Sequence, residues 1–120
     1  VMNRKKEYMP SFLVDYRGVE ESIRRSEKIP VREIILNHYG LVDEEDMPGI
    51  WDFLLETARE SRDTMIRIMN ETDTDEEALQ EMERVFHGKV DKKEQPDEAF
   101  FINAASMMRT LRRQYPELLK

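Results

Sequence analysis

The chain has 120 residues and no cysteine, with 26 acidic against 19 basic side chains and a net charge of −7. Without cysteine, a disulfide scaffold, a thiolate zinc site, an iron–sulfur cluster and a cysteine nucleophile are excluded. No apolar run approaches the roughly 18 residues that mark a membrane span, and no basic stretch leads into an apolar signal segment. We therefore expect a cytoplasmic protein that does not insert into membranes.

The charge is distributed unevenly along the sequence. Residues 34–99 hold 19 acidic and seven basic side chains, a net −12, whereas residues 1–33 and 100–120 carry +2 and +3. This acidity disfavours nucleic-acid binding, which depends on neutralising phosphates with Lys and Arg. Two basic clusters nevertheless leave the alternative of a nucleic-acid-associated accessory protein open. They are Arg4, Lys5 and Lys6 near the start, and Arg109, Arg112 and Arg113 near the end.

Two helices are predicted in the first third of the chain. Residues 1–10 form a polar tail that ends at Pro10, and residues 11–120 form a single helical domain. The first helix covers 11–27, where apolar residues recur at spacings of three and four. A second helix covers 30–39, because Pro30 suits a first helical turn and Gly40 suits the position after a helix end.

The longest predicted helix covers residues 47–70 and follows an acidic connector. Its apolar stripe is interrupted by Arg62, and its opposite face is charged and solvated. We expect ion pairs one turn apart, between Arg59 and Asp63 and between Asp63 and Arg67. The stripe consists of Trp51, Leu54, Leu55, Ala58, Met65, Ile66 and Met69.

Two further helices are predicted toward the C-terminus. Thr74 and Glu77 form a capping box, which predicts a helix over 75–87. The last helix covers 96–114 and stops before Pro116. It carries no charge from Ala99 to Met108, so we expect it near the centre of the fold, buried against more than one partner.

These elements predict an all-α fold. Short connectors favour antiparallel neighbours, so we expect a single compact bundle of about five helices, four longer and one short, around the central helix at 96–114. No segment shows the sustained alternation of a half-buried strand.

Catalysis finds no positive support in the sequence, so no catalytic residue, metal site or cofactor is predicted. Glu83 and His87 lie one helical turn apart, a spacing that suits metal ligands. A helical di-metal site, however, needs Glu-x-x-His on two helices together with further inward carboxylates. Here the spacing is longer and the pair occurs once. A metal-binding or small-ligand-binding bundle stays open as an alternative.

The function we expect is that of a protein-interaction or regulatory module that associates with itself, as a homodimer. Eight methionines are many for this length, and methionine is common on adaptable binding surfaces. We expect the arginine cluster to contact an acidic surface, such as residues 34–99 of a second copy. The apolar anchors are Met47, Trp51, Phe100, Phe101 and Met108. Because apolar residues at helical spacing usually fill the core, most of these side chains have that alternative explanation.

Overall fold

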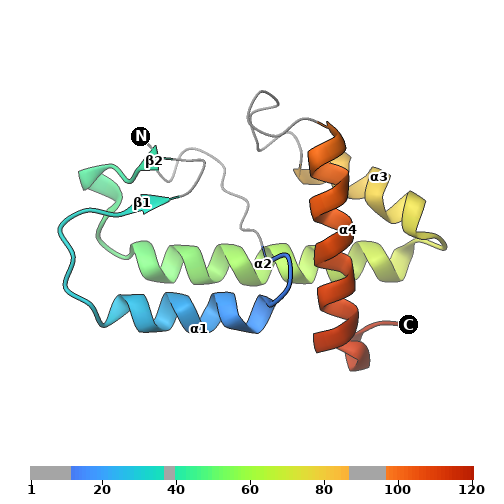
Figure 1. The fold of residues 1–120 in the computed structure, drawn as a ribbon, viewed down its shortest axis with the longest axis horizontal. Coiled ribbons are helices and arrows are strands. Elements are labelled where there is room, and N and C mark those ends of the chain that lie inside the picture. The colour runs from blue at the N-terminus through green and yellow to red at the C-terminus, as the bar shows by residue number, and fades with distance from the viewer. Residues whose placement is uncertain (1–11, 37–39, 87–96) are drawn as a thin grey trace.

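The computed structural model describes residues 12–36, 40–86 and 97–120. Four α-helices pack together in these ranges (Figure 1). They are α1 (Tyr16–Glu27), α2 (Ile50–Glu71), α3 (Asp75–Phe86) and α4 (Asp97–Gln114). The predicted all-α class is confirmed, with four helices in the described residues instead of about five. The predicted tail, residues 1–10, lies outside the described residues.

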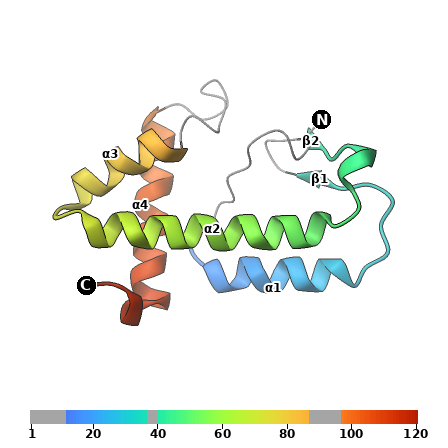
Figure 2. The same cartoon turned by 180° about the vertical axis from the view of Figure 1, so that it is seen from behind.

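Helix α2 runs through the fold as its longest element, with 22 residues or roughly 33 Å. Helix α1 lies alongside it in the opposite direction, and α4 crosses it steeply (Figure 1). Figure 2 shows the same crossing from behind, with α2 in front of α4. Both α2 and α4 contact each of the other three helices. The prediction that the last helix packs against more than one partner is therefore confirmed.

Helix α1 begins five residues later than predicted because Asp15 caps it. The backbone of Asp15 is extended, and its Oδ1 accepts a hydrogen bond from the Gly18 amide at 2.9 Å. A Cβ at position 18 would lie only 2.8 Å from Cγ of Asp15, so this cap favours glycine there. Phe12 precedes the helix and is nevertheless buried in the core.

The helix predicted over 30–39 is wrong. Strand β1 (Ile35–Leu36) pairs antiparallel with β2 (Gly40–Leu41), with Ile35 opposite Leu41. The amide of Val42 also donates to the carbonyl of Ile34 at 2.8 Å. Valine and isoleucine favour extended backbone, and burial of Ile34 and Val42 against the start of α2 outweighs the weak helical spacing.

Helix α2 begins at Ile50, three residues later than predicted. The acidic connector before it forms a 3-10 turn, η1 (Glu44–Asp46). Gly49 then adopts a positive φ of 73°, a conformation that residues with a side chain rarely take. This glycine fixes the direction in which α2 leaves the connector.

The ends of α3 and α4 follow the sequence signals closely. The Glu77 amide donates to Oγ1 of Thr74 at 3.2 Å, as a capping box requires. The Glu77 carboxylate accepts from the Asp73 amide at 3.0 Å, one residue earlier than the usual partner. Helix α4 ends at Gln114, and a 3-10 turn, η3 (Pro116–Leu118), follows.

The core consists of two hydrophobic clusters. The larger lies where α1, α3 and α4 meet the second half of α2, and it buries four of the eight methionines, Met65, Met82, Met107 and Met108. The smaller lies at the other end of α2 and combines Ile50 and Leu54 with Ile34 and Val42, which flank the strand pair. Met69 and Met47 pack against these clusters, so all six methionines of the described residues contribute to the core.

Candidate functional site

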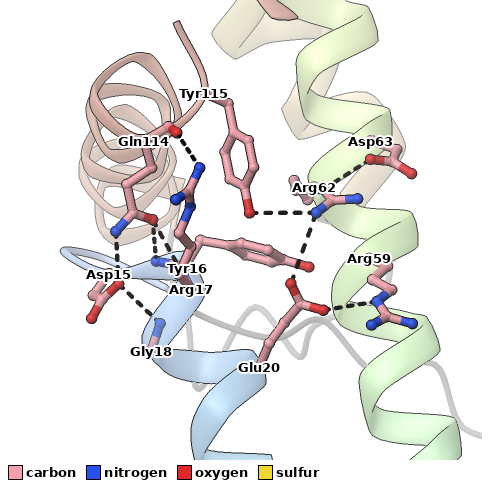
Figure 3. Close-up of polar contacts among 10 residues, drawn as sticks. All are labelled: Asp15, Tyr16, Arg17, Gly18, Glu20, Arg59, Arg62, Asp63, Gln114 and Tyr115. Atoms are coloured by element: carbon pink, nitrogen blue, oxygen red, sulfur yellow. Dashed lines mark hydrogen bonds and ion pairs between the residues drawn. The ribbon is translucent and has the colours of Figure 1, made fainter. Parts of the chain in front are cut away.

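A cluster of polar and aromatic side chains joins α1, α2 and the end of α4 (Figure 3). The guanidinium carbon of Arg62 lies 5.2 Å from the ring centroids of both Tyr16 and Tyr115. Its Nε donates to Asp63 at 2.9 Å. Since a cation is attracted to the faces of aromatic rings, Arg62 holds together segments that are distant in the sequence. Its interruption of the predicted apolar stripe was the one local sign of this role.

Glu20 of α1 lies beside two arginines of α2. Its Oε1 accepts from Nε of Arg59 at 2.7 Å, and its Oε2 lies 3.8 Å from Nη1 of Arg62. Both expected pairs of Asp63, with Arg59 and with Arg67, are wrong. Arg59 reaches across to α1, Asp63 pairs with Arg62, and Arg67 pairs one turn farther along α2. The charged face of α2 thus helps to fix α1 against it.

A second group of hydrogen bonds ties the start of α1 to the end of α4. Oε1 of Gln114 accepts from the amides of Tyr16 and Arg17, and Nε2 donates to Asp15 at 2.7 Å. Arg17 donates back to the Gln114 carbonyl at 2.9 Å. Hydrogen bonds from Gln114 and the Gly18 amide hold the pKa of Asp15 below its ordinary value. The backbone amides in the first turn of α1 therefore find acceptors on two side chains, Gln114 at the end of α4 and the capping residue Asp15.

The chemistry of this cluster suits a structural role. Burial raises the pKa of Tyr16, so its phenol stays neutral. The Tyr16 hydroxyl has no hydrogen-bond partner among the described residues. A neutral, buried phenol beside a charged guanidinium is a poor nucleophile and a poor base. We interpret the cluster as the contact that orders three helices.

The predicted apolar anchors lie in different environments. Phe100 and Met108 are 1% and 2% exposed, so this structure places them in the core and leaves them no surface for a partner. Phe101 is half-buried against the larger cluster. Met47 and Trp51 are half-buried against the smaller one. These five side chains do not form one surface.

The three predicted arginines are partly occupied by contacts within the chain. Arg109 donates to Oγ of Ser106 at 2.9 Å, and Arg113 donates to the carbonyl of Val14. Arg112 forms a two-pronged pair with Asp75, with distances of 3.2 and 2.5 Å. Arg112 therefore meets the expected acidic segment inside its own chain.

An uncovered surface lies on the side of α4 that faces away from α2. Ile102 of α4 is 67% exposed, and Val14, held beside α4 by Arg113, is 73% exposed. Leu13 is held there as well, since its carbonyl accepts from Oγ1 of Thr110 at 2.8 Å. We name this surface the outer face of α4, and it consists of Leu13, Val14, Ile102, Arg109 and Arg113.

A second uncovered surface runs along α2. Asp52, Glu56 and Glu60 follow one another at intervals of one helical turn, and all three are exposed. None of them has an ion-pair partner among the described residues, unlike Asp63 and Glu71 farther along the helix. We name Asp52, Glu56 and Glu60 the acidic edge of α2.

An open groove of about 470 Å³ lies between the end of α2 and α3. Its charged groups already have partners: Glu81 pairs with Arg84 in the groove, Glu71 pairs with Arg67 outside it, and Glu77 accepts from the Asp73 amide. The residues from 12 to 36, 40 to 86 and 97 to 120 contain no group of three side chains that suits a metal ion. His87, from the metal alternative, lies outside these ranges.

Comparison with known proteins gives no indication of the function of this chain. No family model, no curated protein and no solved structure matches the chain. In the part of the chain that the structure describes, no helix is both long enough and apolar enough to cross a membrane.

Proposed function

We propose that this chain is a small acidic protein-interaction module that associates with itself through the outer face of α4. The observation that carries the proposal is that exposed Ile102 and two exposed arginines share one uncovered face of α4, with the exposed residues Leu13 and Val14 held beside that helix. A single exposed apolar residue is ordinary. On this face Ile102 lies between Glu98, one turn before it, and the two arginines farther along the helix. Arginine is enriched in protein interfaces, which favours a partner on this face.

The proposal narrows the set of anchors expected from the sequence. Ile102 and Val14 replace Phe100 and Met108, whose surfaces are already covered within the chain. Arg109 and Arg113 remain, since both are exposed on the same side of α4. The regulatory role and the cytoplasmic location expected from the sequence stay predictions.

Sedimentation velocity over a concentration series tests the proposal. We expect the sedimentation coefficient of the wild type to rise with concentration, and Ile102→Asp to abolish that rise. Ile29→Asp is the matched control, because Ile29 is 58% exposed and lies beyond the far end of α1. Equal effects of the two substitutions, or a concentration-independent coefficient of the wild type, would contradict the proposal.

The nucleic-acid alternative has less support, because Arg112 is held by Asp75 and the chain carries a net charge of −7, which disfavours phosphate binding. Arg4, Lys5 and Lys6 lie outside the described residues. Titration with a generic DNA duplex separates the two proposals. Salt-sensitive duplex binding by a chain that stays monomeric would favour the alternative.

A further inference from the structure

We infer that the outer face of α4 docks on the acidic edge of α2 of a second copy, so that copies join head to tail. This inference rests on the proposed function and names the partner of the same surface. The first observation is the opposite charge of the two surfaces. The outer face of α4 presents Arg109 and Arg113, and the acidic edge of α2 presents three carboxylates. No other described residue neutralises those carboxylates by an ion pair.

The two surfaces match in spacing as well as in charge. Arg109 and Arg113 are four residues apart on α4, and Glu56 and Glu60 are four residues apart on α2. At a rise of about 1.5 Å per residue, each pair spans about 6 Å along its helix. When the two helices lie side by side, both guanidiniums meet a carboxylate in one register.

The arginines keep donors free for such a contact. A guanidinium carries five N–H donors, and each of these two side chains uses one nitrogen within the chain. The bonds to Ser106 and to the Val14 carbonyl also restrict the side chains before docking. The pair between Arg112 and Asp75 is the same kind of contact, formed inside the chain between α4 and α3.

The positions of the two surfaces on the molecule determine which symmetry an assembly of copies can have. Helix α4 lies in front of α2 in Figure 1, and Figure 2 shows the opposite side of α2 uncovered along its length. On each helix the exposed residues of the named surface lie opposite the buried residues that pack into the core, so the outer face of α4 and the acidic edge of α2 point away from each other. A two-fold dimer cannot engage both surfaces of each copy, whereas head-to-tail contacts lead to open chains or closed rings. The inference replaces the homodimer expected from the sequence.

The strength of self-association and its dependence on salt follow from the exposure of the groups on these two surfaces. Exposed ion pairs contribute little individually and are screened by salt. Ile102 and Val14 add apolar burial that salt does not screen. We expect weak association that salt weakens further without removing it.

Reversing the charges tests the inference. Arg109→Glu with Arg113→Glu makes both surfaces acidic, and Glu56→Lys with Glu60→Lys makes both basic. Each double variant alone should lose self-association, with an apparent dissociation constant raised by about tenfold or more. An equimolar mixture of the two should associate again, because each acidic surface then meets a basic one. Circular dichroism melts confirm that both variants are folded.

Glu27→Lys with Glu76→Lys is a control with the same change in net charge as Glu56→Lys with Glu60→Lys, since both residues are exposed and lie outside the two surfaces. This control should associate like the wild type. If the arginine reversals abolish association but the Glu56 and Glu60 reversals do not, the inference is overturned and the proposed function stands. If the wild type is monomeric, both fail. Failure of the mixture to associate overturns the inference alone.

Discussion

The guanidinium carbon of Arg62 lies 5.2 Å from the centroid of the Tyr16 ring, and the Tyr16 side chain is fully buried. Tyr115 contacts the same guanidinium at an equal distance, and its ring meets that of Tyr16 edge to face at 5.9 Å. One guanidinium thus contacts two aromatic rings that come from opposite ends of the chain and that also contact each other. This contact fixes where α4 crosses α2, and with it the position of the outer face of α4.

Replacing Arg62 by alanine should cost about 2 kcal/mol of folding free energy. The change removes two cation–π contacts and leaves Glu20 with one arginine partner instead of two. Urea unfolding measures the loss. Arg67→Ala is the control, since Arg67 is about half exposed and pairs only along its own helix, so that it should cost less than about 0.5 kcal/mol. Equal costs for the two variants would contradict the central role of Arg62.

Tyr16→Phe should be neutral or stabilising by up to about 1 kcal/mol. The hydroxyl that it removes is buried and has no hydrogen-bond partner among the described residues. The ring that contacts Phe12, Arg62 and Tyr115 is kept. Thermal and urea unfolding measure the change. A loss above about 1 kcal/mol would show that the hydroxyl has a partner after all.

Gly18 and Asp15 should be strongly coupled. Alanine at position 18 favours the helix by about 1 kcal/mol, but its Cβ displaces the Asp15 carboxylate, a cap worth a similar amount. We therefore expect Gly18→Ala to bring no gain in the wild type. In an Asp15→Ala background, the same substitution should stabilise by about 1 kcal/mol. A double-mutant cycle by urea unfolding measures the coupling, and additivity would refute it.

The pair between Arg112 and Asp75 should appear in the pH dependence of stability. The hydrogen bond from Arg112 holds the pKa of Asp75 below its ordinary value of 3.8. A lowered pKa in the folded state stabilises the fold above pH 3.8, and this contribution disappears as the pH falls through the folded-state pKa. We expect Arg112→Gln to return the pKa of Asp75 toward 3.8, as measured by carboxyl NMR titration. An unchanged titration would exclude the pair in solution.

Substitutions of Phe100 and Ile102 should affect different properties: the first should lower folding stability, and the second should weaken self-association. Phe100 is buried in the larger cluster, so Phe100→Ala should cost about 3–5 kcal/mol of folding free energy. Ile102 is exposed, so Ile102→Ala should change it by less than about 0.5 kcal/mol while weakening association. Unfolding and sedimentation measurements on both variants check this. A large loss of stability in Ile102→Ala would place this residue in the core instead.

The sequence predicts those parts of the fold that depend on neighbouring residues. The capping box at Thr74 and Glu77 predicts the start of α3, and the long apolar spacing predicts α2. The prediction over 30–39 failed because a short apolar spacing fits a helix and a strand pair equally well. Packing of Ile34 and Val42 against α2 decided between them.

The candidate site is harder to predict because its contacts join distant residues. Gln114 binds Asp15 across 99 residues, and Arg62 contacts Tyr115 across 53. No local pattern brings these side chains together. The expected arginine cluster was also divided by the fold, since Arg112 pairs with Asp75 while Arg109 and Arg113 form no ion pair with a described residue. Which charges a helix leaves free depends on what packs beside it.

Native mass spectrometry of the wild-type protein at low ionic strength tests the central claim most directly, because it reports stoichiometry and bound mass together. Self-association through the outer face of α4 predicts multiples of the 14.4 kDa chain, and head-to-tail contacts predict that they extend beyond the dimer as concentration rises. These species should carry no additional mass. A monomer at every concentration would contradict the account, and a monomer with an extra metal or organic mass would favour a ligand-binding protein.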